Sequence, residues 1–178
     1  MVDGGGTVEY NEYKVVESGE KWWITGITFA ASNCPMFIGE YQHNIDAKGR
    51  LAVPAKFRHV LKKGAVVTKG LDGCLVLYPA VEWKIMAEKL ASLPISRANT
   101  RAFSRLMLAG AMDVEVDRQG RIIIPEYLRI YAKIKKRTVV AGLYKRIEIW
   151  DELEWEKYKK ETEKDSSDIA EQLGELGV

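Results

Sequence analysis

One sequence pattern occurs twice in this chain of 178 residues. DAKGRLAVPAKFR begins at Asp46, and DRQGRIIIPEYLR begins at Asp117, 71 positions later. Both run Asp, two residues, Gly, Arg, three apolar residues and Pro, and both end in Arg. With one residue inserted, CLVLYPAVEW and RIEIWDELEW also align, and each ends in Glu-Trp. A match over two such segments indicates an internal duplication and constrains the chain to build similar structures twice.

Each copy is predicted to begin with a strand that leads into a tight turn. In the second copy Met112, Val114 and Val116 alternate with acidic residues, and a period of two is typical of a half-buried strand. Asp favours turns because its carboxylate accepts backbone N–H bonds, and Gly takes positive φ without strain. The residues expected to fix the turns are Asp46, Gly49, Asp117 and Gly120.

A short apolar strand and a short helix are predicted after each turn. Pro54 and Pro125 end the strand and fit the first position of a helix, where no N–H is needed. Apolar residues at i, i+3 and i+4 predict the helix face in each copy. These residues are Phe57, Val60 and Leu61 in the first copy and Leu128, Tyr131 and Ala132 in the second.

A strand pair and a further helix close each copy. The closing helices are expected to begin near Pro79 and Asp151. Trp83 and Trp155 are expected to anchor the core or an interface, because large aromatic side chains serve packing more often than ligand binding.

Residues 85–111 predict a helical connection between the copies. Ser96 has the chemistry of an N-cap. Arg97, Arg101 and Arg105 recur every four residues and form a basic face. A solvated face and a binding face both fit this spacing, and the solvated face is the simpler interpretation.

The predicted fold class is α+β, with two similar strand-hairpin units joined by a helical hairpin. We interpret residues 1–35 as a poorly ordered extension or as the product of a start codon assigned too early. The acidic, polar composition after the second copy predicts a disordered tail. The expected ranges are 1–35 for the extension, 36–84 and 112–158 for the repeats, 85–111 for the connection and 159–178 for the tail.

The formal net charge of +2 hides a segregation of charge. Residues 1–35 hold two Lys and five Asp/Glu (−3), residues 36–150 hold 21 Lys/Arg and 10 Asp/Glu (+11), and residues 151–178 hold four Lys and ten Asp/Glu (−6). A basic body with an acidic end suggests a polyanionic partner, most often nucleic acid. A solvated basic surface without a partner explains the same composition, so charge alone leaves both interpretations open.

The sequence has few residues of the types that catalyse reactions or bind metal ions. Cys34 and Cys74 lack CxxC spacing, and His43 and His59 are the two histidines. We therefore expect no catalytic residue, no metal and no cofactor. A disulfide framework is also not expected, which suits a reducing cytosol. No run of about 18 apolar residues occurs, so no membrane partner is expected.

The cations of the repeated turns are the candidate binding residues: Lys48, Arg50, Arg118 and Arg121. The structural alternative is that each Arg pairs with the Asp of its own turn or with a carbonyl. A rigid turn presents guanidinium groups at little ordering cost, and these groups suit phosphates and guanine edges. An enzyme with two Asp as acid and base, and a protein-interaction module such as an antitoxin-like partner, are the competing classes. Affinity for DNA without a partner protein would discriminate them.

From Met36 to about Tyr158 the chain resembles the MraZ family of bacterial transcriptional regulators. The segments that carry the resemblance are DAKGRLAVPAKFR, GLDGCLVLYPAVEW, DRQGRIIIPEYLR and GLYKRIEIW. Two DxxxR motifs in this context are highly specific, whereas one alone would be weak. The family's DNA-binding turn maps onto Asp46, Lys48, Arg50, Asp117, Arg118 and Arg121.

The resemblance implies two AbrB-like swapped-hairpin β-barrel units in each chain and a homo-oligomeric ring of subunits. It implies binding to double-stranded DNA, as short direct repeats upstream of the division and cell-wall gene cluster that includes its own promoter. The expected location is therefore cytoplasmic and nucleoid-associated. Gln119 stands where the first copy has Lys48, so we expect the second turn to bind more weakly or to read a different base.

Overall fold

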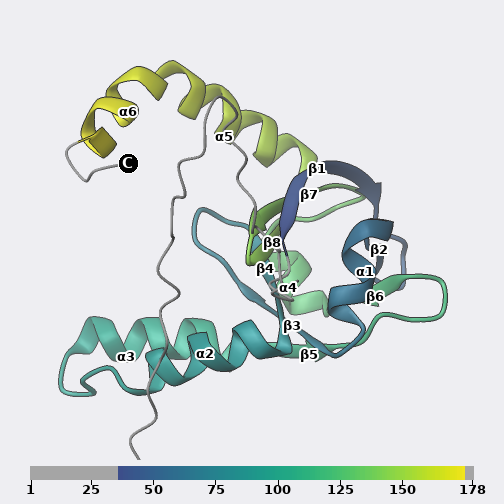
Figure 1. The fold of residues 1–178 in the computed structure, drawn as a ribbon, viewed down its shortest axis with the longest axis horizontal. Helices are drawn as coiled ribbons and strands as arrows, with labels where there is room; N and C mark the ends of the chain where they lie inside the picture. The colour runs from purple at the N-terminus through teal and green to yellow at the C-terminus, as the bar shows by residue number, and fades with distance from the viewer. Residues whose placement is uncertain (1–35, 175–178) are drawn as a thin grey trace, which may run out of the picture. The chain divides into compact units, whose positions relative to one another are not determined.

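The computed structural model describes residues 36–174 (Figure 1). The expectations for residues 1–35, and the end of the predicted tail at 175–178, lie outside the described residues. The first copy forms β1 (Phe37–Asn44), β2 (Arg50–Ala52), α1 (Ala55–Leu61), β3 (Ala65–Lys69), β4 (Leu75–Pro79) and α2 (Ala80–Ala91). The connection adds α3 (Ala98–Ser104) and the π-helical turn η1 (Arg105–Ala109). The second copy forms β5 (Met112–Val114), β6 (Arg121–Ile123), α4 (Glu126–Tyr131), β7 (Arg137–Tyr144), β8 (Arg146–Asp151), α5 (Glu152–Lys164) and α6 (Ser166–Gly174).

Strands of the two copies are interleaved in one six-stranded antiparallel sheet with the order β1-β7-β8-β4-β3-β5. The repeat makes β5 the counterpart of β1, β7 of β3 and β8 of β4. The order is therefore a palindrome. The first strand of each copy pairs with the third strand of the other, and β4 pairs with β8 at the centre. The α+β class is confirmed, and the two units are interleaved instead of lying side by side.

A second, two-stranded ribbon joins the copies through β2 and β6. Leu51 lies opposite Ile122, at the middle of an antiparallel register of three residue pairs. Both side chains are 1% exposed and belong to the main core. A local two-fold axis that relates the copies therefore passes between Leu51 and Ile122, because these residues are equivalent positions of the repeat.

Helices α1 and α4 follow the ribbon and cover the core. Pro54 and Pro125 have φ of −50° and −56° and extended ψ. They stand one position before the first helical residue, not at it as expected from the sequence, which is a shift within the usual ambiguity of helix ends. Phe57 and Leu61 from α1, and Leu128 from α4, are buried at the positions expected for a helix face.

The predicted aromatic anchors are confirmed in a second, smaller core cluster. Trp83 and Trp155 pack against this cluster and are partly buried. The ring of Trp155 lies 5.4 Å from that of Trp150, and the ring of Trp83 lies 5.9 Å from that of Tyr78. These contacts seat α2 and α5 on the sheet at the positions where the sequence predicted helices to start.

Two predictions about helices differ from the structure. Ser96 is not an N-cap, because α3 begins after Arg97 and has no side-chain cap. Residues 159–174, which the composition predicted to be disordered, continue α5 and form α6. Within residues 36–174, no helix is both long and apolar enough to cross a membrane.

Shortening Leu51 or Ile122 to Ala is expected to lower the free energy of unfolding by about 2–5 kcal/mol, because each change leaves a cavity between the two copies. Ile123→Ala is the matched control, since Ile123 in the same ribbon is 60% exposed; its cost is expected to stay below about 1 kcal/mol. Chemical denaturation followed by circular dichroism measures all three. Equal losses for Ile122 and Ile123 would contradict the assignment of the ribbon to the core.

Candidate nucleic-acid interface

The first repeated turn is closed by the carboxylate of Asp46. Its Oδ1 accepts the backbone N–H groups of Lys48 and Arg50, both at 2.9 Å. Its Oδ2 accepts Nε–H of Arg50 at 2.6 Å. Gly49 has φ of 76°, and its N–H donates to the carbonyl of Asp46 at 2.9 Å. One carboxylate therefore holds both the backbone of the turn and the Arg50 guanidinium.

The second turn repeats this geometry around Asp117. Oδ1 accepts the N–H groups of Gln119 at 2.8 Å and Arg121 at 2.9 Å. Oδ2 accepts Nε–H and Nη2–H of Arg121 at 2.9 and 2.8 Å. Gly120 has φ of 79°, and its N–H donates to the Asp117 carbonyl at 2.9 Å. The structure thus brings the expected turn residues together in the same way in both copies.

Backbone N–H groups lower the pKa of both turn carboxyl groups. The N–H of Arg50 is the largest cause for Asp46, and the N–H of Arg121 is the largest cause for Asp117. A carboxyl group whose folded-state pKa is lowered contributes stability above its ordinary pKa of 3.8, and this stability is lost as the pH falls through the folded-state value. Both carboxylates therefore stay ionised, and both turns stay closed, at neutral pH.

Arg50 and Arg121 each lie against the Asp of their own turn. This pairing is the structural alternative that the sequence left open for them. Their side chains are still 33% and 27% exposed. A guanidinium has about five N–H donors in a plane, and the carboxylate binds one edge of it. The remaining donors are pre-oriented and available to a further ligand.

Lys48 and Arg118 are the freer cations of the two turns. Both are exposed, and neither forms an ion pair with any carboxylate in the described part of the chain. They occupy different positions in the repeat, because Lys48 aligns with Gln119 and Arg118 with Ala47. Each turn therefore presents one extended cation beside one fixed guanidinium, but not in the same arrangement.

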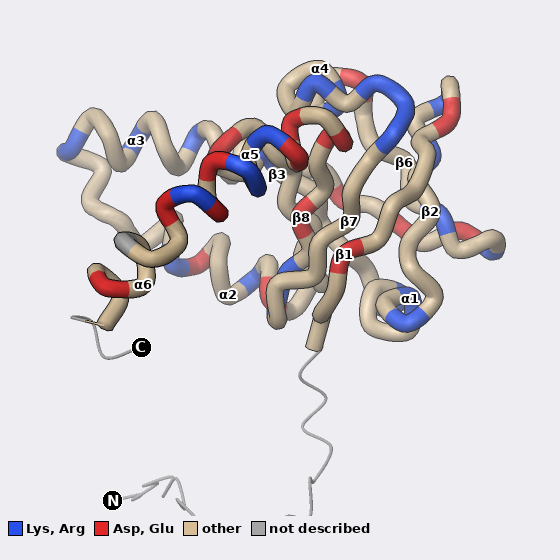
Figure 2. The backbone as a smooth tube through the Cα atoms, turned by 90° about the horizontal axis from the view of Figure 1, so that it is seen from above, with Lys and Arg blue, Asp and Glu red and all other residues tan. Residues whose placement is uncertain are grey.

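The two turns lead into opposite ends of the β2–β6 ribbon. Arg50 lies opposite Ile123, and Arg121 lies opposite Ala52. Figure 1 shows β2 and β6 together on one side of the sheet, away from α5 and α6, and Figure 2 shows charged residues beside both strands. The ribbon sets the separation of the turns, because it carries both of them.

The backbone of each turn is also held by the other copy. The carbonyl of Gly49 accepts the N–H of Ile124 at 2.8 Å, and the carbonyl of Gly120 accepts the N–H of Val53 at 2.9 Å. These bonds extend the ribbon by one pair at each end. Neither turn therefore keeps its full set of backbone partners within its own copy.

Arg58 and Arg129, which are not among the site residues predicted from the sequence, lie on these glycines. The guanidinium of Arg58, from α1, contacts Gly120 in the turn of the second copy. Arg129, from α4, contacts Gly49 in the turn of the first copy, where an added Cβ would lie 3.2 Å from its Nε. Their shared position at the end of both repeated segments was the available signal. It does not reveal which turn each Arg reaches, because that requires the interleaved fold.

Matches to a single family model cover residues 36–106 and 107–175, one for each copy. The family is described as "MraZ protein, putative antitoxin-like". The chain belongs to the MraZ family.

Named relatives in the MraZ family match most of the chain. It is 49% identical over 143 residues to the transcriptional regulator MraZ of Pediococcus pentosaceus, covering 80% of this chain and 100% of that protein. It is 52% identical over 141 residues to that of Desulforamulus reducens, covering 79% of this chain and 99% of that protein. Because these relatives are named transcriptional regulators, the chain is a transcription regulator and not an enzyme.

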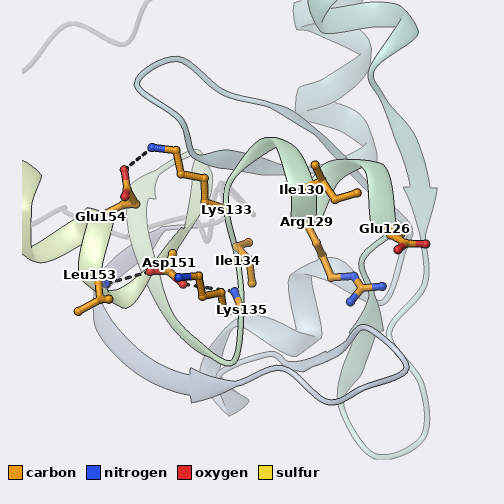
Figure 3. A pocket seen from close by; sticks show the side chains of 9 residues that line it. All are labelled: Glu126, Arg129, Ile130, Lys133, Ile134, Lys135, Asp151, Leu153 and Glu154. Atoms are coloured by element: carbon orange, nitrogen blue, oxygen red, sulfur yellow. Dashed lines mark hydrogen bonds and ion pairs between the residues drawn. The ribbon is translucent and has the colours of Figure 1, made fainter.

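A hollow of about 400 Å³ lies beside α4 in this member of the MraZ family (Figure 3). Its charged lining residues are Glu126, Arg129, Lys133, Lys135, Asp151 and Glu154. Lys133 pairs with Glu154 at 2.9 Å, and Asp151 accepts the N–H of Lys135 at 3.3 Å. Equal numbers of cations and carboxylates leave no excess charge for a phosphate. Among residues 36–174, no cluster of His, Cys, Asp and Glu could hold a metal ion.

Gly49→Ala is expected to destabilise the protein more than Gly73→Ala. Both residues have positive φ, of 76° and 82°, so both changes carry a conformational cost of about 1–3 kcal/mol. The Cβ at Gly49 would also lie 2.7 Å from the carbonyl oxygen of Ile124, whereas nothing lies within 4 Å at Gly73. Thermal unfolding of the two variants measures the difference. Equal losses of thermal stability in the two variants would mean that the backbone at Ile124 can move away from the added Cβ without a free-energy cost.

Proposed function

We propose that this chain is a sequence-specific regulator that binds double-stranded DNA through its two repeated turns. The observation that carries the proposal is that each turn holds one guanidinium on its Asp carboxylate and presents a second, exposed cation that pairs with no carboxylate among the described residues. Guanidinium groups suit phosphate oxygens and the major-groove edge of guanine. Because the turns are ordered before binding, little entropy is lost when DNA docks.

The proposed contacts divide between two pairs of residues. Lys48 and Arg118 reach the phosphate backbone as free charges, which sets affinity and salt dependence. Arg50 and Arg121 offer the guanidinium edge that their Asp partners leave open, which suits base recognition. The second turn, with Gln119 in place of the Lys, binds more weakly or reads a different base.

The palindromic strand order supports an assignment of the fold as AbrB-like swapped-hairpin β-barrel units. The exchanged strands, β1 with β7 and β5 with β3, are what such an assignment requires. On this proposal residues 36–84 and 112–158 are the two DNA-binding repeats, and residues 85–111 connect them.

The proposed target is a set of short direct repeats upstream of the division and cell-wall gene cluster, including the protein's own promoter. One Arg contributes roughly 1–3 kcal/mol of base discrimination, which is too little against genomic DNA. Several turns tethered in a ring of subunits raise the effective affinity by roughly 10²–10⁴ when their spacing matches the repeats. The protein on this proposal is cytoplasmic and associated with the nucleoid.

A protein-interaction module is the second candidate, because the family description includes the words antitoxin-like. In that case the turns would be structural, as the Asp–Arg pairing allows, and the partner would be a protein. DNA binding by the purified chain alone separates the two candidates.

Changing Lys48 and Arg118 together to Ala is expected to weaken DNA binding and to reduce the slope of log affinity against log salt by about 0.9 for each phosphate that is no longer neutralised. Fluorescence anisotropy on DNA from upstream of the protein's own gene, across a salt series, measures both. Lys62→Ala with Lys89→Ala is the matched control, since both are exposed cations outside the turns. Equal effects of the two double variants would point to charge alone, and no binding by wild type would favour the interaction module.

An array of repeats is expected to bind at least tenfold more tightly than a single repeat, because tethered turns bind in concert. Moving one repeat by half a helical turn, about 5 base pairs, is expected to remove most of this gain. Anisotropy with single, double and shifted repeats measures the effect. If one isolated repeat bound as tightly as the array, the multivalent mechanism would be wrong.

A further inference from the structure

The β2–β6 ribbon has one face in the core and one face toward solvent. Leu51 and Ile122 point into the core, and their neighbours along each strand point the other way, because successive side chains of a strand lie on opposite faces. The outward face consists of two cross-strand pairs, Arg50 with Ile123 and Arg121 with Ala52. Each pair therefore places an apolar side chain beside one of the guanidinium groups that are proposed to recognise bases.

Ile123 and Arg50 form a pair of the kind whose side chains approach most closely. The N–H of Ile124 donates to the carbonyl of Gly49 at 2.8 Å. Hydrogen-bonded and non-hydrogen-bonded pairs alternate along an antiparallel ladder, so the next pair, Arg50 with Ile123, is non-hydrogen-bonded. The Cα atoms of such a pair are about 4.5 Å apart. Because Asp46 holds Nε of Arg50, Ile123 shares its face of the ribbon with a guanidinium of fixed direction.

The ribbon itself does not require a large side chain at position 123. Ile123 is 60% exposed, so it contributes little to the core. Its counterpart in the first copy is Ala52, 71 positions earlier, and that end of the ribbon keeps the same antiparallel pairing. The side chain of Ile is branched at Cβ and has few χ1 rotamers, so it presents its apolar surface in a nearly fixed direction. A ligand that contacts this surface therefore binds at little cost in side-chain entropy.

The major groove of DNA offers one group for each member of this pair. Guanine presents its N7 and O6 acceptors, which suit a guanidinium, and thymine presents a C5-methyl group, which suits an apolar side chain. Neighbouring bases of one strand are about 3.4 Å apart along the helix axis, which is close to the separation of two residues paired across the ribbon. A guanine and a thymine on adjacent base pairs therefore match Arg50 and Ile123 in both chemistry and spacing.

We propose that Ile123 is a specificity-determining residue that contacts the C5-methyl group of a thymine next to the guanine recognised by Arg50. The contact removes the methyl group and part of the exposed Ile123 side chain from water. At the other end of the ribbon Ala52 is smaller and only partly exposed, so it offers less apolar surface beside Arg121. The two ends of the ribbon therefore differ in their preference for thymine. This inference rests on the proposed function, because it names a further DNA group that the same site recognises.

Replacement of thymine by deoxyuridine tests this contact, because deoxyuridine keeps the base pairing with adenine and lacks only the C5-methyl group. The duplex carries the repeats from upstream of the protein's own gene, and each thymine position is replaced in turn in every repeat. Fluorescence anisotropy measures the affinity of the full chain for each duplex. The variants are Ile123→Ala and Ile123→Val. Ile130→Ala is the matched control, since Ile130 is 70% exposed on α4, outside the ribbon. Circular dichroism checks the fold of each variant.

Wild type is expected to lose affinity by about fourfold or more at one thymine position, which is the effect of one methyl group that is no longer buried. Ile123→Ala is expected to bind the thymine and deoxyuridine duplexes equally at that position, because the side chain that contacts the methyl group is gone. Ile123→Val, which keeps a branched apolar side chain, and Ile130→Ala are expected to retain the difference. The slope of log affinity against log salt is expected to match that of wild type in every variant, because no phosphate contact changes.

The outcomes separate this inference from the proposed function. A wild type that binds the repeats with the same affinity whether or not they contain deoxyuridine overturns the methyl contact and leaves the proposed function intact. The same holds if Ile123→Ala keeps the sensitivity of wild type. Loss of the sensitivity in Ile130→Ala as well would show that the effect does not depend on the ribbon, and the contact would again be wrong. A wild type that binds no DNA removes the proposed function and this inference together.

Discussion

The antiparallel pairing of β2 with β6 is the constraint on which the rest of the structure depends. It places the equivalent residues Leu51 and Ile122 opposite each other at the local two-fold. Extended by one bond at each end, it gives the glycine of each turn a backbone partner from the other copy. The duplicated sequence is therefore two halves of one folding unit, and neither half holds its turn in this form without the other.

The same exchange explains why the two turns are held in a fixed conformation. An Asp carboxylate orders each turn locally, through bonds that span four residues. A guanidinium from the opposite copy, Arg58 or Arg129, then packs on the glycine of that turn. Because local and long-range contacts fix the same few atoms, the donors that remain on Arg50 and Arg121 have their orientation set by the fold and not by the ligand.

Local features could be predicted from the sequence, because their causes lie within a few positions of each other. The turns follow from Asp and Gly spacing, and the anchoring by Trp83 and Trp155 follows from their place in the repeat. The exchange of strands could not be predicted from periodicity, since an alternating strand fits a partner from either copy equally well. The cross-copy contacts of Arg58 and Arg129 could not be predicted for the same reason.

The acidic C-terminal segment was predicted wrongly for a different reason. Its polar composition is typical of disorder, yet Ile169 and Leu173 have the spacing of a helix face. The average composition of a segment does not reflect the spacing of two apolar residues, so a prediction from composition misses a short amphipathic helix within a charged segment.

The interleaved sheet also sets the order of events during synthesis. Strand β1 pairs with β7, so Phe37 has no pairing partner until Tyr144 has been synthesised. At roughly 5–20 residues per second, the ribosome takes about 5–21 s to add the 107 residues from Phe37 to Tyr144. Throughout that interval the first copy has an unpaired strand edge and a turn without its cross-copy support. The first copy of a nascent chain of this design therefore completes its fold only when the second copy has emerged, at a point where translation is nearly complete.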